Sequence, residues 1–466
     1  MATTIPLYGF GGGGGTGATL TVTAPANATV TVSKGSKTKL KTASARGRAI
    51  FKGLESGRWR VAITDGSRYS SEDVTITSDY SATLAFYKRY GFRRAKNDSD
   101  PDGRIAYLFD AAGKTPMYVD LSTGSPVWGD WKDFVYEIAC PVMLNSDGGE
   151  AYELNREDQT KKSDGSASDI SDGSFAGNAM VRFSKFIWVK RYEDENYEYV
   201  IFSDAQVDED YHAYAHTDAG GKVQPAFYWG MFKGSGVSGK LRSLADRAPL
   251  NNVTRSTEIA YAQANGAGHN TIYNSGWQFI GDLLTLISKS DNSREKFGTG
   301  RTKSSNSTTI NTGTTKAYGP FWGSDNGSSD VKAFWIEGFW GNFWESMCGL
   351  INKNGKIMAK MTPPYSLTAE DYSDTGITPG GTSGGYLSRA KMDGHLGLVP
   401  MEANGSATTY YCDGLRFSNS NVSYAMVSGM RATDTQCGSR LLMLQYTADN
   451  KNTTFTARLT FLSGEV

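Results

Sequence analysis

Cysteine is scarce in this chain, with four residues among 466. Cys140, Cys348, Cys412 and Cys437 are far apart and show no C-x-x-C spacing. Such spacing predicts neither a disulfide framework nor a zinc cluster. We expect ordinary buried or half-buried thiols, because free cysteine behaves as a small apolar residue.

Histidine is equally scarce, and the only close pair is His212 and His216. On a helix, a spacing of four would place both imidazoles on one face, near the acidic residues Asp208 and Asp210. The residues from 210 to 217 instead alternate large and small side chains, as an extended segment does, and no third histidine is near in sequence. We therefore predict no metal site and no cofactor.

Net charge and long apolar runs are also missing. Lysine plus arginine equal aspartate plus glutamate at 48 each, so no overall basic field attracts nucleic acid or an acidic bilayer. No run approaches the roughly 18 to 20 apolar residues of a spanning helix, and the N-terminus lacks the charged-then-apolar order of a signal peptide. We expect no nucleic-acid partner, no membrane insertion and synthesis in the cytoplasm.

Catalytic motifs are absent as well. No Gly-x-Ser-x-Gly elbow stands between a strand and a helix, and the glycine pairs at 266–268 and 298–300 lack the context of a phosphate-binding loop. Paired carboxylates occur by chance among 48 acidic residues and indicate nothing. We predict that the protein is not an enzyme.

Glycine (54 residues) and aromatic residues (12 %) are abundant, which is typical of a β-rich, loop-rich protein. Residues 1–17 are glycine-rich and predict a flexible leader. From Ala18 to Tyr87 apolar residues alternate between turn signals, which predicts about seven short strands in a β-sandwich. The segment Ala49–Ile63 resembles a hairpin of immunoglobulin-like modules, which usually act as spacers.

Residues 88–466 contain no further linker or repeat and predict one large module, mainly β with a few helices. The clearest strands are expected at 105–109, 180–189, 197–202 and 226–231. A helix is expected at 275–288, because Trp277, Ile280, Leu284 and Ile287 recur at helical spacing and send one face to the core. Asn274 or Ser275 can cap its start.

The most informative segment is Phe334–Leu350, with three tryptophans and three phenylalanines in seventeen residues. Large aromatic rings dominate the energetics of whatever they pack against. We therefore expect this run at the centre of a fold. Within it, Gly341-Asn342-Phe343-Trp344-Glu345 resembles the Gly-Asn-Val-Trp-Glu motif of the formylglycine-generating-enzyme family, a branch of the C-type lectin fold.

The order of motifs from the strand near 180 to Met361-Thr-Pro-Pro-Tyr365 also resembles tail fibres and related virion proteins of phages that infect gut bacteria. The C-terminal segments 408–416 and 424–429 resemble the ligand-binding end of such proteins, which varies in relatives diversified by retroelements. The resemblance implies an N-terminal immunoglobulin-like spacer (18–87) and an elaborated C-type lectin module with long loop insertions (88–466), in an α+β fold that is mainly β.

The chain departs from two branches of that fold. The enzyme branch needs a reactive cysteine pair, whereas Cys412 and Cys437 are 25 residues apart in different local sequences. The calcium-binding branch uses Glu-Pro-Asn or Gln-Pro-Asp loops, but Gln224-Pro-Ala226 lacks the carboxylate. Neither oxidase activity nor calcium-dependent sugar binding is expected.

Recognition by surface side chains remains, and tyrosine, arginine and asparagine resemble the composition of an antibody paratope. We predict that outward-facing residues between 410 and 446 bind the ligand: Tyr411, Asp413, Arg416, Phe417, Asn419, Asn421, Tyr424, Met430, Arg431, Asp434, Gln436, Arg440, Gln445 and Tyr446.

The functional hypothesis is a phage tail-fibre protein, located on the virion, that attaches to a bacterial surface protein or glycan. It would contact other virion proteins through its N-terminal region and form a homotrimer, since weak sites gain from multiplicity. The alternative is a structural virion protein that serves assembly without binding a receptor. An oxidase of the formylglycine-generating type is a third hypothesis.

Overall fold

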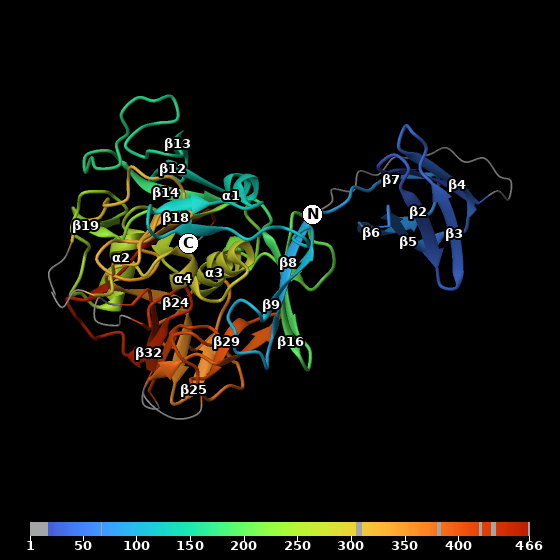
Figure 1. The fold of residues 1–466 in the computed structure, drawn as a ribbon. Coiled ribbons are helices and arrows are strands. Elements are labelled where there is room, and N and C mark those ends of the chain that lie inside the picture. The colour runs from blue at the N-terminus through green and yellow to red at the C-terminus, as the bar shows by residue number, and fades with distance from the viewer. Residues whose placement is uncertain are drawn as a thin grey trace. The chain divides into compact units, whose positions relative to one another are not determined.

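The computed structural model describes residues 17–66, 68–303, 310–379, 384–418, 422–429 and 435–464. The predicted leader at 1–17 lies outside these ranges except for Gly17. Strands dominate the described residues and four α-helices accompany them, which confirms the prediction of a mainly β fold (Figure 1). Contacts divide the chain into two compact units, with the division between Lys88 and Arg89.

The first unit consists of two packed β-sheets. Alternate residues such as Val30, Val32, Val61 and Ile63 are fully buried, and they join one apolar core with residues of the other sheet. The indole N–H of the buried Trp59 donates to the Glu55 carbonyl at 2.9 Å. The sheets run β4-β1-β7 and β3-β2-β5-β6, with strands β1 (Ala18–Thr23), β2 (Thr29–Lys34), β3 (Lys37–Thr42), β4 (Arg48–Leu54), β5 (Gly57–Thr64), β6 (Tyr69–Ile76) and β7 (Tyr80–Thr83).

The second unit contains three larger sheets. The five-stranded sheet, ordered β17-β15-β16-β8-β9, consists of β8 (Arg89–Ala95), β9 (Ile105–Phe109), β15 (Trp188–Glu193), β16 (Tyr197–Ser203) and β17 (Tyr211–His212). The six-stranded sheet, ordered β13-β12-β14-β18-β34-β21, consists of β12 (Ala139–Asn145), β13 (Glu150–Glu153), β14 (Gly177–Phe183), β18 (Phe227–Gly230), β21 (His269–Thr271) and β34 (Leu459–Leu462).

The eight-stranded sheet carries most of the C-terminal region. Its path is β26-β25-β24-β31-β32-β30-β27, and β33 pairs with β24. Its strands are β24 (Trp344–Lys353), β25 (Lys356–Ala359), β26 (Ser373–Asp374), β27 (Gly385–Tyr386), β30 (Gly414–Phe417), β31 (Val422–Val427), β32 (Leu442–Tyr446) and β33 (Phe455–Thr456). Four two-stranded ribbons complete the unit: β10 (Tyr118–Asp120) with β11 (Ser125–Val127), β19 (Ser235–Val237) with β20 (Lys240–Arg242), β22 (Lys332–Ala333) with β23 (Ile336–Glu337), and β28 (Arg389–Asp393) with β29 (Gly397–Glu402).

One predicted strand is wrong in its extent. The run expected at 180–189 is interrupted between β14 and β15, where Phe186 adopts φ 53°. The two halves belong to different sheets. A non-glycine residue with positive φ ends regular pairing, so the apolar pattern continues across a turn that composition alone does not mark.

The helices are α1 (Lys132–Ile138), α2 (Arg255–Gln263), α3 (Asn274–Ser288) and α4 (Ser293–Phe297). The expected helix is confirmed as α3, but every one of its residues is buried rather than one face alone. The predicted cap is also wrong, because Tyr273 occupies the N-cap position without a side-chain cap bond. Asn274 instead accepts from the Gln278 amide at 3.0 Å. None of the described helices is long and apolar enough to cross a membrane.

The aromatic run lies in the core, as predicted. Its six large rings, at 334, 335, 339, 340, 343 and 344, are all at most 5 % exposed. The Trp340 indole N–H donates to the Gly298 carbonyl at 3.0 Å, and Trp335 donates to the Arg156 carbonyl at 2.7 Å. The polar edges of these two indoles are therefore satisfied inside the fold.

Shortening a buried side chain of α3 should destabilise the fold. Leu284→Ala removes a fully buried side chain from α3, and we expect a loss of about 2–5 kcal/mol in the free energy of unfolding. Urea unfolding followed by tryptophan fluorescence measures it. Val127→Ala, at a position that is 40 % exposed, should change stability by less than about 0.5 kcal/mol. Equal losses in both variants would contradict this view of α3.

Candidate functional site

Five of the predicted ligand-binding residues are buried, so their expected outward orientation is wrong. They are Tyr411, Asp413, Phe417, Tyr424 and Arg440, each at most 5 % exposed. Three of them, Tyr411, Asp413 and Arg440, form hydrogen bonds or ion pairs inside the fold. Tyr411 donates to both oxygens of the Glu198 carboxylate, at 3.0 and 2.8 Å.

Asp413 and Arg440 fix the base of the C-terminal loops. The backbone N–H of Arg440 donates to Asp413 Oδ2 at 2.6 Å, and its guanidinium donates to Asp282 Oδ1 of α3 at 2.5 Å. Burial raises the pKa of Asp413 to about 7, partly offset by the Arg440 N–H and the charges of Arg294 and Arg440. These residues support the loops and do not face solvent.

The remaining described candidates are accessible. Arg416, Gln436 and Gln445 are half-buried, and Tyr446 is 38 % exposed. Arg416 donates to Gln436 Oε1 at 3.2 and 2.8 Å, so these two side chains form one polar patch. Five further candidates lie outside the described residues: Asn419, Asn421, Met430, Arg431 and Asp434.

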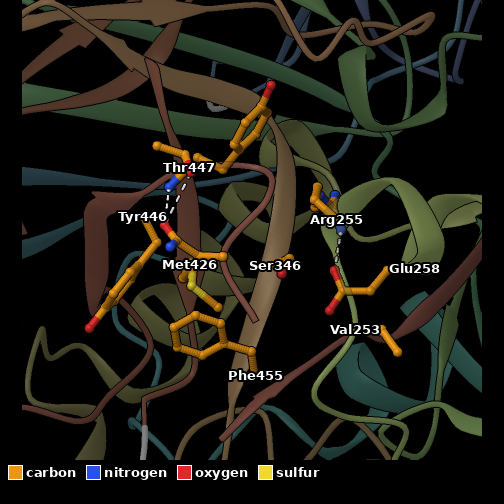
Figure 2. Close-up of a pocket in the computed structure, with 10 residues that line it drawn as sticks. Val253, Arg255, Glu258, Ser346, Met426, Tyr446, Thr447 and Phe455 are labelled. Atoms are coloured by element: carbon orange, nitrogen blue, oxygen red, sulfur yellow. Dashed lines mark hydrogen bonds and ion pairs between the residues drawn. The ribbon is translucent and has the colours of Figure 1, made fainter. Parts of the chain in front are cut away.

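A small pocket opens beside this region, on the face formed by β24, β31 and β32 (Figure 2). Tyr424 of β31 and Tyr446 of β32 are cross-strand partners and both line it. The Tyr446 ring packs edge-on against Phe455, with centroids 4.8 Å apart. The pocket is lined by Val253, Arg255, Glu258, Ser346, Tyr424, Met426, Tyr446, Thr447, Asn450 and Phe455.

One wall of the pocket carries buried charge. Arg255 and Glu258 of α2 form an ion pair at 3.1 Å, drawn as a dashed line in Figure 2. Burial raises the pKa of Glu258 to about 7, with Arg255 opposing the shift. Arg255 also contacts Cys348 Sγ at 2.9 Å and Thr271 Oγ1 at 2.7 Å. The guanidinium is thus held in place from several sides.

The opposite rim is held by a turn. The backbone N–H and the hydroxyl of Thr447 donate to Asn450 Oδ1 at 2.7 and 3.2 Å. The enclosed space is only about 20 Å³, enough for about one water molecule. The pocket cannot enclose a small-molecule substrate. A ligand would contact its rim, where Tyr446 and Asn450 are exposed.

Sequence reasoning missed the α2 contribution entirely. Arg255 and Glu258 are separated by three residues on a short polar helix, which is the pattern of an ordinary surface ion pair. Arg255 is buried against Thr271 of β21 and Cys348 of β24, which lie 16 and 93 residues away in the sequence. No local signal distinguishes them from exposed charges.

The histidines and cysteines are dispersed. His216 is fully buried, and its Nε2 lies 3.2 Å from the Phe183 carbonyl, while His212 packs 4.9 Å from His395 between ring centroids. All four cysteines are buried, and none of them forms a disulfide bond. Within the described ranges no three histidine, cysteine, aspartate or glutamate side chains are grouped to hold a metal ion.

Comparison with known proteins gives only distant likenesses. No protein-family model matches the chain, and no curated protein matches it. Among solved structures, the P3c and U1 variants of the Major Tropism Determinant are 8 % and 9 % identical, each with 88 % of this chain and 81 % of that chain covered, at TM-scores of 0.26 and 0.25. The Bacillus anthracis TIE protein is 12 % identical over 39 % of this chain, at a TM-score of 0.14, and the match spans 30 % of its length.

Asp413→Asn tests the buried carboxyl. Because the folded-state pKa (about 7) exceeds the usual 3.8, the native protein binds an extra proton between these values, and its stability falls by up to about 1.4 kcal/mol per pH unit as pH rises through this window. The asparagine variant should lack this slope. Its stability relative to the unmodified protein should therefore rise with pH until about pH 7. Urea unfolding between pH 5 and 8 measures both slopes, with the exposed Asp133→Asn as control. Identical slopes in Asp413→Asn and the unmodified protein would contradict the assignment.

Proposed function

We propose that the chain is a phage tail-fibre protein whose second unit, an elaborated C-type lectin module, attaches to the bacterial surface. The first unit, with two packed sheets, would be an immunoglobulin-like spacer. The observation that carries the proposal is the C-terminal face, where exposed and half-buried polar side chains stand on strands anchored to buried ion pairs. A rigid base with adaptable polar contacts is what reversible recognition requires.

The side chains of this face support recognition of a macromolecule. Tyr446 is the large exposed ring, and Arg416, Gln436 and Gln445 are adaptable hydrogen-bonding groups beside it in the same sheet region. Tyrosine and arginine dominate the energetics of interfaces. A pocket with room for about one water favours binding across a surface over enclosure of a substrate.

The thiol chemistry argues against the oxidase hypothesis. Cys412 is buried, and burial together with the neighbouring Asp413 raises the pKa of its thiol far above the usual value. A reactive cysteine needs a lowered pKa and access to solvent. The proposal is a binding protein rather than an enzyme, and we propose that it works on the virion as a homotrimer or similar multivalent display.

Competition with phage adsorption tests the proposal. The full chain, added to a permissive host, should reduce adsorption of the parent phage, and Tyr446→Ala should compete about tenfold less well, because it removes an exposed aromatic anchor. Tyr118→Ala is the matched control, since that tyrosine is 46 % exposed in the ribbon of β10 and β11. Adsorption is measured as free phage remaining over time.

The structural alternative predicts a different result. If the protein serves assembly alone, the chain will not compete on any permissive host, while particles that carry Tyr446→Ala will adsorb normally. That pair of results would overturn the attachment proposal.

A further inference from the structure

A second, larger pocket in the second unit forms a groove, and none of the predicted ligand-binding residues lines it. Its volume is about 290 Å³, close to the lower end of the usual range for ligand pockets. It is formed by the β10–β11 ribbon, α1 and two loop segments. The lining residues include Trp128, Lys132, Tyr136, Glu157, Tyr318 and Trp322.

Aromatic rings form much of this groove. Tyr318 and Trp322 stack at 4.9 Å between centroids with their planes 12° apart, and Tyr318 is 42 % exposed. Trp128, which is half-buried, packs edge-on against Tyr136 at 5.8 Å. Flat apolar rings that remain open to solvent are costly unless something covers them, so they indicate a binding surface.

Polar groups stand beside the rings. Glu157 is exposed, and its Oε1 accepts a hydrogen bond from the Tyr136 hydroxyl. Lys132 is also exposed, with its Nζ 5.8 Å from the Tyr136 ring centroid. One carboxylate and one ammonium give the groove both an acceptor and a donor without a net charge. This pairing suits a neutral ligand that carries many hydroxyl groups.

The loop that carries Tyr318 is fixed from beneath. The buried Lys332 Nζ donates to the carbonyls of Thr315 and Tyr318, at 2.8 and 2.9 Å, and to the Gln159 side chain. Trp322 exchanges both backbone hydrogen bonds with Lys332, at 3.1 and 2.8 Å. The aromatic platform is therefore held in one geometry before any ligand arrives, which lowers the entropic cost of binding.

Two glycines make the close approaches possible. A Cβ at Gly124 would lie 2.3 Å from the Trp322 Nε1, and a Cβ at Gly319 would lie 2.5 Å from Glu157 Oε2. Gly124 also has φ +76°, a conformation that other residues rarely adopt. Both the indole and the carboxylate therefore occupy positions that a larger residue in either loop would disturb.

We propose that this groove binds a short neutral saccharide. The C–H face of a sugar ring would lie on the open face of Tyr318, whose other face stacks on Trp322, and the sugar hydroxyls would bond Glu157 and Lys132. A proline-rich peptide also fits aromatic grooves, but proline has no N–H and would add no donor for the Glu157 carboxylate beyond the Tyr136 hydroxyl. The saccharide satisfies both the rings and the charged pair. This site is independent of the C-terminal face and of the attachment proposal.

Titration of the full chain tests the inference. The probes are cellotriose, maltotriose, mannotriose and triacetylchitotriose. Saturation-transfer NMR and calorimetry measure their binding to the protein. At least one should bind, and Tyr318→Ala should weaken it about tenfold through the lost stacking. Glu157→Gln should also weaken binding, since a carboxylate is a stronger acceptor than an amide. Tyr192→Ala is the matched control, because Tyr192 is also 38 % exposed and stacks on Tyr199 but does not line the groove. It should bind the saccharide like the unmodified protein.

Three results would overturn the inference. None of the four saccharides binds, or binding occurs without change in Tyr318→Ala and Glu157→Gln, or a polyproline decapeptide binds the groove while the saccharides do not. Circular dichroism and thermal unfolding of each variant confirm that it is folded. Saccharide titration with Tyr318→Ala and Glu157→Gln measures the groove, whereas phage adsorption with Tyr446→Ala measures the C-terminal face, so failure of either proposal gives a separate readout.

Discussion

The buried carboxylate of Glu345 joins two of the main sheets. Glu345 lies in β24 of the eight-stranded sheet, and it accepts two hydrogen bonds at 2.8 Å from Arg458, the residue directly before β34 of the six-stranded sheet. Lys233 donates to the same carboxylate and to the Phe343 carbonyl at 3.1 Å. Burial alone would raise the pKa of Glu345, but Arg458 and Lys233 outweigh it and hold the pKa below its usual range. The charge therefore persists inside the fold.

Similar ion pairs connect the other layers. Arg94 of β8 binds both oxygens of Asp291, at 2.6 and 2.8 Å, and also Glu198 of β16 at 2.7 Å. The Asp282 carboxylate of α3 accepts hydrogen bonds from Arg191 of β15 and from Arg440. Burying such pairs adds little net stability, because desolvation offsets the attraction, but removing one partner leaves an uncompensated charge. The main consequence of these ion pairs is that they constrain how α3 packs against the sheets around it.

This arrangement explains which predictions from sequence succeeded. Strand alternation, the α3 period and the burial of the aromatic run depend on neighbours along the chain, so a single sequence indicates them. The orientation of Tyr411 and Arg440 depends on partners 213 and 158 residues away, Glu198 and Asp282. Polar residues in a loop are usually exposed. Nothing local in the sequence marks these as buried, which is why five of the nine described candidates are buried instead of exposed.

Buried and accessible residues of the C-terminal face differ in how well they tolerate substitution. Arg440 bonds Asp413 and Asp282 of α3 inside the fold, whereas Arg416, Gln436 and Tyr446 are half-buried or exposed. Replacing an accessible side chain costs little stability, while replacing a member of the buried ion pairs costs several kcal/mol, on the order of 3–5. If the face binds a receptor as proposed, substitutions that alter ligand preference without unfolding the protein are confined to the accessible set. The buried residues then define the fold, and the accessible residues define what the proposed face binds.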